Sequence, residues 1–176
     1  MNSLKNIDRI SELRGEKKEK QPGVYRWWFK KEAVENLLSS VKDLVEWNKI
    51  QQKNINDQDY LALYFGMTKN VNNRFKWHIS QKHSPSAIRR GFISTLRRTL
   101  SALLDIPLSM SENMINEFID ANCILEWEYC GSEEEAKTIE KKEITKFYYP
   151  LNLHSNKNIS KELKSIFSQK RKEVLK

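Results

Sequence analysis

Three stretches of the chain carry the apolar and aromatic pattern of β-strands. Residues 24–29 (VYRWWF) are aromatic and β-branched and follow the turn signal Pro22-Gly23. Residues 60–66 (YLALYFG) form a short apolar run that ends at a glycine, which is typical of a buried strand, and residues 122–130 alternate as a strand does. We therefore expect a central sheet of about three strands.

Between these strands, apolar residues recur at helical spacing. The pattern predicts helices over 32–47, about 69–80, 87–104, 111–120, 132–147 and 160–174, with a surface loop over 48–59. Thr68 is expected to cap the second helix, and Ser132 with Glu135 to form a capping box. In the third helix, Phe92 and Leu96 should face inward. The order of strands and helices predicts an α+β domain.

The charge of the chain indicates a class of binding partner. The chain has 176 residues, 39% of them hydrophobic, which is enough for one core, and its net charge of +8 favours a polyanion such as nucleic acid. No Asp or Glu occurs from Tyr60 through Leu104, a long one-sign segment suited to a phosphate backbone. The alternative is a solvated helix face. The candidate nucleic-acid contacts in this segment are Lys69, Lys76, Arg89, Arg90, Arg97 and Arg98.

Several classes of protein are disfavoured. No apolar run approaches the roughly 20 residues of a membrane span, and the N-terminus has no signal sequence, so we expect a soluble, cytoplasmic protein without a membrane partner. Cys123 and Cys130 flank one strand, too far apart for a disulfide. Walker A, GxGxxG and GxSxG motifs are absent from the sequence, as are CxxC pairs for zinc.

A few polar residues occupy positions where the apolar pattern points inward. Glu140 and Glu143 both fall in the apolar stripe of the 132–147 helix, where a carboxylate must be paired, hydrogen-bonded, protonated or bound to a metal. Arg74 and His78 are four residues apart and share one helix face. Tyr25 and Tyr64 each stand on an expected central strand, where core filling is the simpler interpretation.

Together these residues resemble the GIY-YIG nuclease family. The resemblance rests on Gly23-Val24-Tyr25, on Tyr64-Phe65-Gly66, and on Arg74, His78, Glu140 and Asn152 in that order. It covers the chain from about Gly23 to Asn152, with GVY and YFG in place of the namesake triplets. It implies a small antiparallel sheet flanked by helices. The chain would then consist of a charged N-terminal segment at 1–22, a nuclease domain at 23–154 and a basic C-terminal helix or tail at 155–176. Helical insertions within the nuclease domain are expected at 31–58 and 81–121.

The resemblance also implies the chemistry, hydrolysis of a phosphodiester with one divalent ion, Mg²⁺ or Mn²⁺. A single carboxylate, favoured to be Glu140 over Glu143, would hold the metal. Arg74 would stabilise charge on the phosphate. Tyr64 would orient or deprotonate the attacking water, its pKa drawn down from about 10 by Lys69, Arg74 and the metal.

The remaining motif residues would assist. Tyr25 would hydrogen-bond near the reaction centre, and His78 competes with Tyr64 as the general base because it titrates near neutral pH. Asn152 would order the turn after Pro150 and help to hold the site.

The sequence therefore favours a metal-dependent endonuclease that cuts DNA, with double-stranded DNA as the expected substrate. Its expected role is in restriction, in repair or in a mobile element. A homodimer is compatible with this function. The leading alternative is a non-catalytic nucleic-acid-binding module on the same fold. A second alternative is an interaction protein that oligomerises through exposed Trp27, Trp28 or Trp77.

Overall fold

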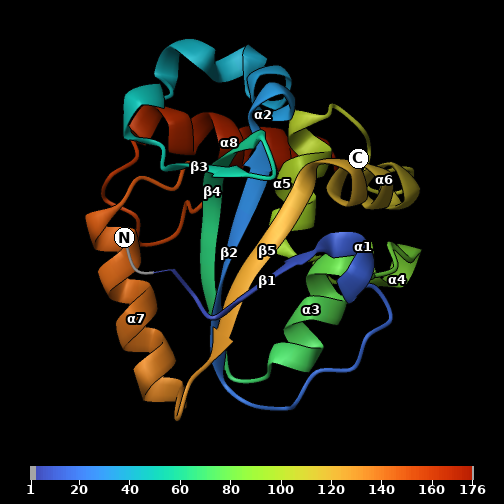
Figure 1. Cartoon of the computed structure of the whole chain (residues 1–176). Helices are drawn as coiled ribbons and strands as arrows, with labels where there is room; N and C mark the ends of the chain where they lie inside the picture. Colours follow the sequence, from blue (N-terminus) through green and yellow to red (C-terminus); the bar gives the residue numbers. More distant parts are fainter. Residues whose placement is uncertain (1–2, 176) are drawn as a thin grey trace.

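The centre of the protein is a twisted antiparallel sheet of five strands in the order β1-β5-β2-β4-β3 (Figure 1). The computed structural model describes residues 3–175, so residues 1, 2 and 176 of the two expected terminal segments lie outside it. β2 is the central strand, hydrogen-bonded to β5 on one side and β4 on the other. The strands are β1 (Asn6–Arg9), β2 (Gly23–Lys30), β3 (Gln52–Ile55), β4 (Gln58–Thr68) and β5 (Cys123–Tyr129).

The prediction of about three strands was therefore wrong, because the sheet has two further strands at its edges. β1 lies in the charged segment 1–22 and pairs with β5, while β3 lies in the expected loop 48–59 and pairs with β4. Asn56 and Asp57 join β3 to β4 with φ of 50° and 60°, the backbone of a tight hairpin turn. Both edge strands are four residues long and half exposed, so they carry little apolar signal.

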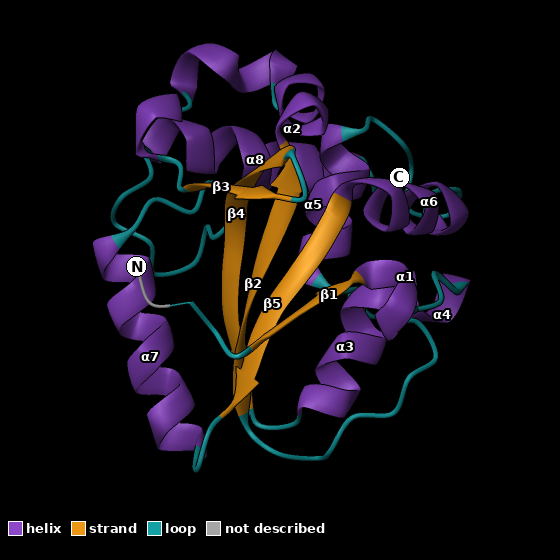
Figure 2. Cartoon of the chain, in the orientation of Figure 1, coloured by secondary structure: helices purple, strands orange, loops and turns teal. Residues whose placement is uncertain are grey.

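Helices cover both faces of the sheet (Figure 2). On one face, α3, α5 and α8 pack against Tyr25, Trp27 and Phe29 of β2, and on the other face α7 packs against Val24 and Trp28. The helices are α1 (Ile10–Leu13), α2 (Lys31–Leu37), α3 (Val71–Ile79), α4 (Pro85–Arg89), α5 (Thr95–Leu103), α6 (Glu112–Asn122), α7 (Glu133–Lys146) and α8 (Lys161–Glu173), with 3₁₀ turns η1 (Ser39–Leu44) and η2 (Trp47–Lys49).

Two expected helices are interrupted. The 32–47 helix ends at Leu37 and continues as 3₁₀ turns, which still bury Leu38, Val41 and Val45. The 87–104 helix is two helices, α4 and α5, separated at Gly91 with φ of 70°. Phe92 next to this break is 56% exposed, contrary to expectation.

Helix caps also differ in one place. Asn70 rather than Thr68 caps α3, since its side chain accepts from the Asn73 N–H at 3.0 Å, while the Thr68 hydroxyl accepts from the Asn70 N–H. Ser132 caps α7 as expected, accepting from the Glu135 N–H at 3.1 Å. The Glu135 carboxylate accepts from the Gly131 N–H at 2.6 Å, one residue before the partner of a standard capping box.

The burial of the tryptophans narrows the alternative of an interaction protein to Trp77. Trp27 and Trp28 are fully buried in the sheet, so they cannot mediate oligomerisation, whereas Trp77 on α3 is 41% exposed. Within residues 3–175, no helix is both long enough and apolar enough to cross a bilayer.

Candidate active site

Two tyrosines from neighbouring strands lie side by side on the face of the sheet that carries α3. In the β2–β4 register, Tyr25 pairs with Gly66 and Trp27 pairs with Tyr64, which places both phenols on that face. Their ring centroids are 6.3 Å apart. Tyr25 is 1% exposed, and Tyr64 is half-buried.

The glycines beside these tyrosines are required by close contacts. A Cβ on Gly66 would lie 2.6 Å from the Tyr25 hydroxyl oxygen, well inside van der Waals contact. A Cβ on Gly23 would lie 2.5 Å from the Glu128 carbonyl oxygen on β5 and 2.7 Å from a methyl of Val71 on α3. The two glycines therefore allow the Tyr25 ring and α3 to approach the sheet.

His78 fixes the Tyr25 hydroxyl from α3. Its Nε2 shares a hydrogen bond with the Tyr25 hydroxyl at 2.9 Å, and its Nδ1 shares one with the Ser94 hydroxyl at 2.7 Å. Burial, with the charges of Arg74 and Arg97, holds the pKa of His78 well below its usual range. Both ring nitrogens are thus occupied in a neutral imidazole that is 2% exposed, and His78 supports Tyr25 rather than facing a water in solvent.

Arg74 lies one helical turn before His78 and is half-buried. Its positive charge opposes the rise that burial causes in the pKa of Tyr25, of Tyr64 and of Glu140. Within residues 3–175 it forms no ion pair. A half-buried guanidinium without a carboxylate partner is free to bind a phosphate.

Glu140 reaches this point from α7, on the other side of the sheet. Its Oε1 accepts from the Met67 N–H of β4 at 3.1 Å. Burial raises the pKa of Glu140, while the Met67 N–H, Arg74 and His154 act in the opposite direction. The Met67 contact orients the carboxylate and leaves Oε2 outside the hydrogen bonds of the described residues.

Glu143 is committed elsewhere. Its Oε2 accepts from Arg26 Nη2 at 3.1 Å and from the Tyr149 hydroxyl at 2.9 Å. Arg26 is fully buried and also donates to Glu126 at 2.6 Å, which completes a structural network under α7. The geometry thus distinguishes the two glutamates: Glu140 binds the Met67 N–H of β4, and Glu143 neutralises Arg26.

Asn152 hydrogen-bonds to the open edge of β4 beyond the end of β3. Its Nδ2 donates to the Phe65 carbonyl at 2.6 Å, and its Oδ1 accepts from the Phe65 N–H at 2.8 Å. The preceding residue, Leu151, donates its N–H to the Leu63 carbonyl at 3.0 Å. Asn152 therefore pairs with β4 as a neighbouring strand would, and it holds the backbone of Phe65, the residue between Tyr64 and Gly66.

The expected lowering of the Tyr64 pKa was wrong for the chain alone. Burial raises the pKa of Tyr64, although Arg74 and Arg171 oppose this shift. Lys69 is not among the groups that shift the pKa of Tyr64. The Tyr64 hydroxyl is consequently a neutral phenol at pH 7.

The predicted nucleic-acid contacts divide into exposed and buried residues. Arg97 must be withdrawn, since it is fully buried and donates to His83 Nε2 at 2.9 Å, to the His78 carbonyl at 3.1 Å and to Asn116 Oδ1 at 2.9 Å. Arg98, the next residue, is half-buried. The exposed members of the set are Lys69, Lys76, Arg89 and Arg90.

Sequence reasoning missed Arg171 on α8. The pKa of Arg171 is lowered to about 10, because the guanidinium is largely removed from water and lies near Arg98, while Tyr64 acts in the opposite direction. The basic composition of the last residues gave a signal, but nothing in the sequence distinguished Arg171 from Lys170 or Lys172.

Glu140 is the residue that could hold a divalent ion here. Residues 3–175 contain no group of three or more His, Cys, Asp or Glu side chains arranged for a metal. A hard cation such as Mg²⁺ binds through one or two carboxylates and fills its other positions with waters and phosphate oxygens. The free oxygen of an oriented Glu140 beside Arg74 fits this arrangement.

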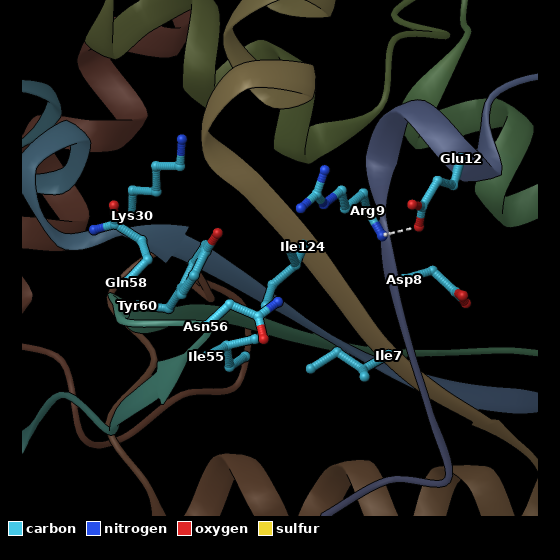
Figure 3. A pocket seen from close by; sticks show the side chains of 10 residues that line it. All are labelled: Ile7, Asp8, Arg9, Glu12, Lys30, Ile55, Asn56, Gln58, Tyr60 and Ile124. Carbon is cyan, nitrogen blue, oxygen red and sulfur yellow. Dashed lines mark hydrogen bonds between the residues drawn. The ribbon is translucent and has the colours of Figure 1, made fainter.

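A groove elsewhere on the molecule is separate from this cluster. It has a volume of about 600 Å³ and lies between β1 and the β3–β4 hairpin, with Arg9, Lys30 and Tyr60 in its lining (Figure 3). Its carboxylates are Asp8 and Glu12, and Glu12 accepts from the Arg9 N–H at 3.1 Å. None of the predicted catalytic residues lines it.

Comparison with known protein families identifies the domain to which the cluster belongs. The family model described as the GIY-YIG catalytic domain matches residues 23–173, which include the whole cluster and Arg171. No curated protein and no solved structure matches the chain.

Proposed function

The chain belongs to the GIY-YIG family, and from this premise we propose that it is a metal-dependent endonuclease that hydrolyses the phosphodiester bonds of double-stranded DNA. The observation that carries the proposal is that β4, α3 and α7 bring Tyr64, Arg74 and Glu140 to one end of the sheet. Tyr64 lies beside Tyr25, Arg74 stands one turn before the His78 that binds Tyr25, and Glu140 binds the Met67 N–H of β4, three residues after Tyr64. The charges of Arg74 and Glu140 both act on the pKa of the Tyr64 phenol.

Arg74 is proposed to bind the phosphate that is cut. Its planar guanidinium can donate to two phosphate oxygens at once and keeps its charge at any working pH. As the attacking oxygen adds, negative charge builds on these oxygens, and a fixed cation at this place stabilises the transition state more than the ground state.

Tyr64 is proposed to orient the attacking water and, with its pKa lowered on substrate binding, to accept its proton. Tyr64 is the more exposed of the two tyrosines and lies nearer to free solvent than His78. Tyr25 and His78 form the buried support behind it, since their shared hydrogen bond fixes the Tyr25 ring against Tyr64.

Glu140 is proposed to hold Mg²⁺ or Mn²⁺. A divalent ion bound there supplies positive charge to the phosphate and to the leaving oxygen. The protein's own part is to orient the carboxylate, through the Met67 N–H, and to keep it ionised beside Arg74.

The exposed cations Lys69, Lys76, Arg89 and Arg90 are proposed to bind the DNA backbone on either side of the cut. Lys69 and Lys76 flank Arg74 along the chain at either end of α3, and Arg89 with Arg90 ends α4. Contacts of this kind increase affinity without reading sequence.

The experiment is cleavage of supercoiled plasmid by the full chain with Mg²⁺, with Mn²⁺ and with EDTA. Wild type should nick or linearise the plasmid only with a metal, and Glu140→Gln should not. Glu134→Gln, an exposed change on the same helix, is the matched control and should cut as wild type does. Plasmid binding without cutting under any metal would instead support the non-catalytic module.

A further inference from the structure

Two arginines on neighbouring helices lack the carboxylate partners that buried cations need. Arg98 on α5 and Arg171 on α8 form no ion pair within the described residues. α5 and α8 pack against each other (Figure 1), and Arg171 hydrogen-bonds to Thr99, the residue that follows Arg98. The charge of Arg98 contributes to the lowered pKa of Arg171. Two neighbouring cations removed from water repel each other, so this arrangement is costly in the absence of an anion.

The guanidinium of Arg171 is held in place from one side only. Its Nε donates to the Thr99 hydroxyl at 2.8 Å, and that hydroxyl in turn donates to the Thr95 carbonyl at 2.7 Å. The two Nη atoms of Arg171 make no hydrogen bond within residues 3–175. Thr99 thus fixes the plane of the guanidinium and leaves its terminal donors available.

Arg98 carries the second unused donor. Its Nε is shielded from solvent and has no hydrogen-bond partner in the described part of the chain. A buried N–H without an acceptor is rare in proteins, because it has lost its hydrogen bonds to water without gaining a replacement. An oxygen ligand between Arg98 and Arg171 would supply the missing acceptor.

The location of these donors indicates which anion they would bind. Tyr64 packs against the core cluster that includes Phe167 of α8, one helical turn before Arg171, and the charge of Arg171 acts on the pKa of the Tyr64 phenol. Arg74 is assigned to the phosphate that is cut, and a nucleic-acid strand presents further phosphates on both sides of it. The Arg98–Arg171 pair is therefore placed for a neighbouring phosphate of the same strand.

We propose that Arg98 and Arg171 form a second phosphate-binding site, which holds an internal backbone phosphate of the nucleic acid next to the one that is cut. The identity of the ligand rests on the proposed function, whereas the presence of an anion site does not. Bound at this site, the strand would be kept in register with Tyr64 and Arg74, so the pair acts by positioning the substrate.

The test is binding, measured with EDTA present so that no cutting is needed. Inorganic phosphate at millimolar concentration should raise the melting temperature of wild type above that in chloride of equal ionic strength. The double variant Arg98→Gln/Arg171→Gln should show a clearly smaller shift, because only Arg74 remains to bind phosphate near the site. Lys5→Gln, an exposed cation next to β1 at the far edge of the sheet, is the control and should keep it.

Binding of a DNA duplex gives the second arm. Arg171→Gln should weaken binding roughly tenfold at low salt and reduce the slope of log Kd against log salt by about one, the value for one phosphate contact. The same losses on duplexes with and without 5′-phosphates identify an internal phosphate. Losses confined to 5′-phosphorylated ends would overturn that assignment.

Two results would overturn the site itself. One is an unchanged phosphate shift in the double variant. The other is a lower melting temperature of the variants in chloride together with wild-type DNA binding, which would show a structural role. Failure of the nuclease proposal looks different, because a chain that never cuts could still bind phosphate through this pair.

Discussion

The ring of Tyr25 lies against the backbone of Gly66, so closely that a Cβ on Gly66 would stand 2.6 Å from the Tyr25 hydroxyl oxygen. The two residues are direct partners in the β2–β4 register. This contact explains why a strand that is otherwise rich in apolar side chains carries a glycine there. It also makes the position of the Tyr25 hydroxyl, and its bond to His78, depend on a residue that takes no part in the chemistry.

Gly66→Ala is therefore expected to displace Tyr25 and to reduce cleavage by at least about tenfold, an effect of about 1.4 kcal/mol on the barrier. The forced repacking should lower the free energy of unfolding by about 1–3 kcal/mol. Plasmid cleavage and urea unfolding measure the two effects.

Gly131→Ala is the matched control for this change. A Cβ there would lie 3.2 Å from the end of the flexible Glu135 side chain, which can move aside. Cleavage at the wild-type rate by Gly66→Ala would show that the contact between Tyr25 and Gly66 does not position the site.

His78 predicts a dependence of stability on pH. Its pKa is held well below its usual range in the folded protein, whereas in the unfolded chain it titrates near 6.5. The unfolded state thus binds the extra proton first, and stability falls as the pH drops below about 6.5, by up to about 1.4 kcal/mol per pH unit. Above that pH His78 contributes no slope.

Urea unfolding of wild type and His78→Gln at pH 5 and pH 7.5 isolates this contribution. The difference in unfolding free energy between the two pH values should be smaller in the variant, because the carboxylates and His83 titrate in both proteins. Equal differences in the two proteins would contradict a neutral, buried His78.

The two glutamates of α7 should respond differently to the same conservative change. Glu140→Gln removes a carboxylate that burial makes costly, so stability at pH 7 should stay the same or rise while cleavage is lost. Glu143→Gln leaves Arg26 with one counter-charge fewer, and it should cost about 1–3 kcal/mol of stability while cutting persists.

Thermal unfolding and plasmid cleavage of both variants, measured side by side, test this separation. Loss of cutting in Glu143→Gln with full activity in Glu140→Gln would move the metal ligand to Glu143 and refute the geometric assignment.

Asn152 gives a prediction that depends on a single atom pair. In Asn152→Asp, the donor that faces the Phe65 carbonyl becomes an oxygen, so attraction turns into repulsion at 2.6 Å. We expect a loss of about 1–3 kcal/mol in the free energy of unfolding and a lower cleavage rate. Asn152→Ser keeps a hydroxyl but not the paired contact, so its stability should lie between those of wild type and Asn152→Asp. A fully stable Asn152→Asp would exclude the proposed edge pairing.

The sequence predicted the parts of the fold that depend on strong local patterns. Tyr25 and Tyr64 are expected on central strands because short apolar and aromatic runs stand there, one after Gly23 and one ending at Gly66, and Ser132 is expected at a helix start from its spacing to Glu135. The edge strands β1 and β3 were missed because short, half-exposed strands carry almost no apolar signal.

The sequence could not show which of the clustered arginines are buried donors and which have unused donors. Arg97 and Arg98 are adjacent and identical in type, yet the first is a fully buried structural donor and the second has an unpartnered Nε. Which way each points depends on the break at Gly91 and on the packing of α5 against α8, neither of which the pattern shows. Arg171 was overlooked for the same reason, since only the folded chain brings it to Tyr64.

The central claim is that Glu140, Tyr64 and Arg74 form one reaction centre for phosphodiester hydrolysis. The measurement that tests it most directly is the single-turnover cleavage rate of a labelled DNA duplex by wild type and Glu140→Gln, with Mg²⁺ and with enzyme in excess. We predict a rate at least about 100-fold lower in the variant, about 2.7 kcal/mol, with duplex binding in EDTA unchanged. Cleavage by Glu140→Gln at the wild-type rate would contradict the claim.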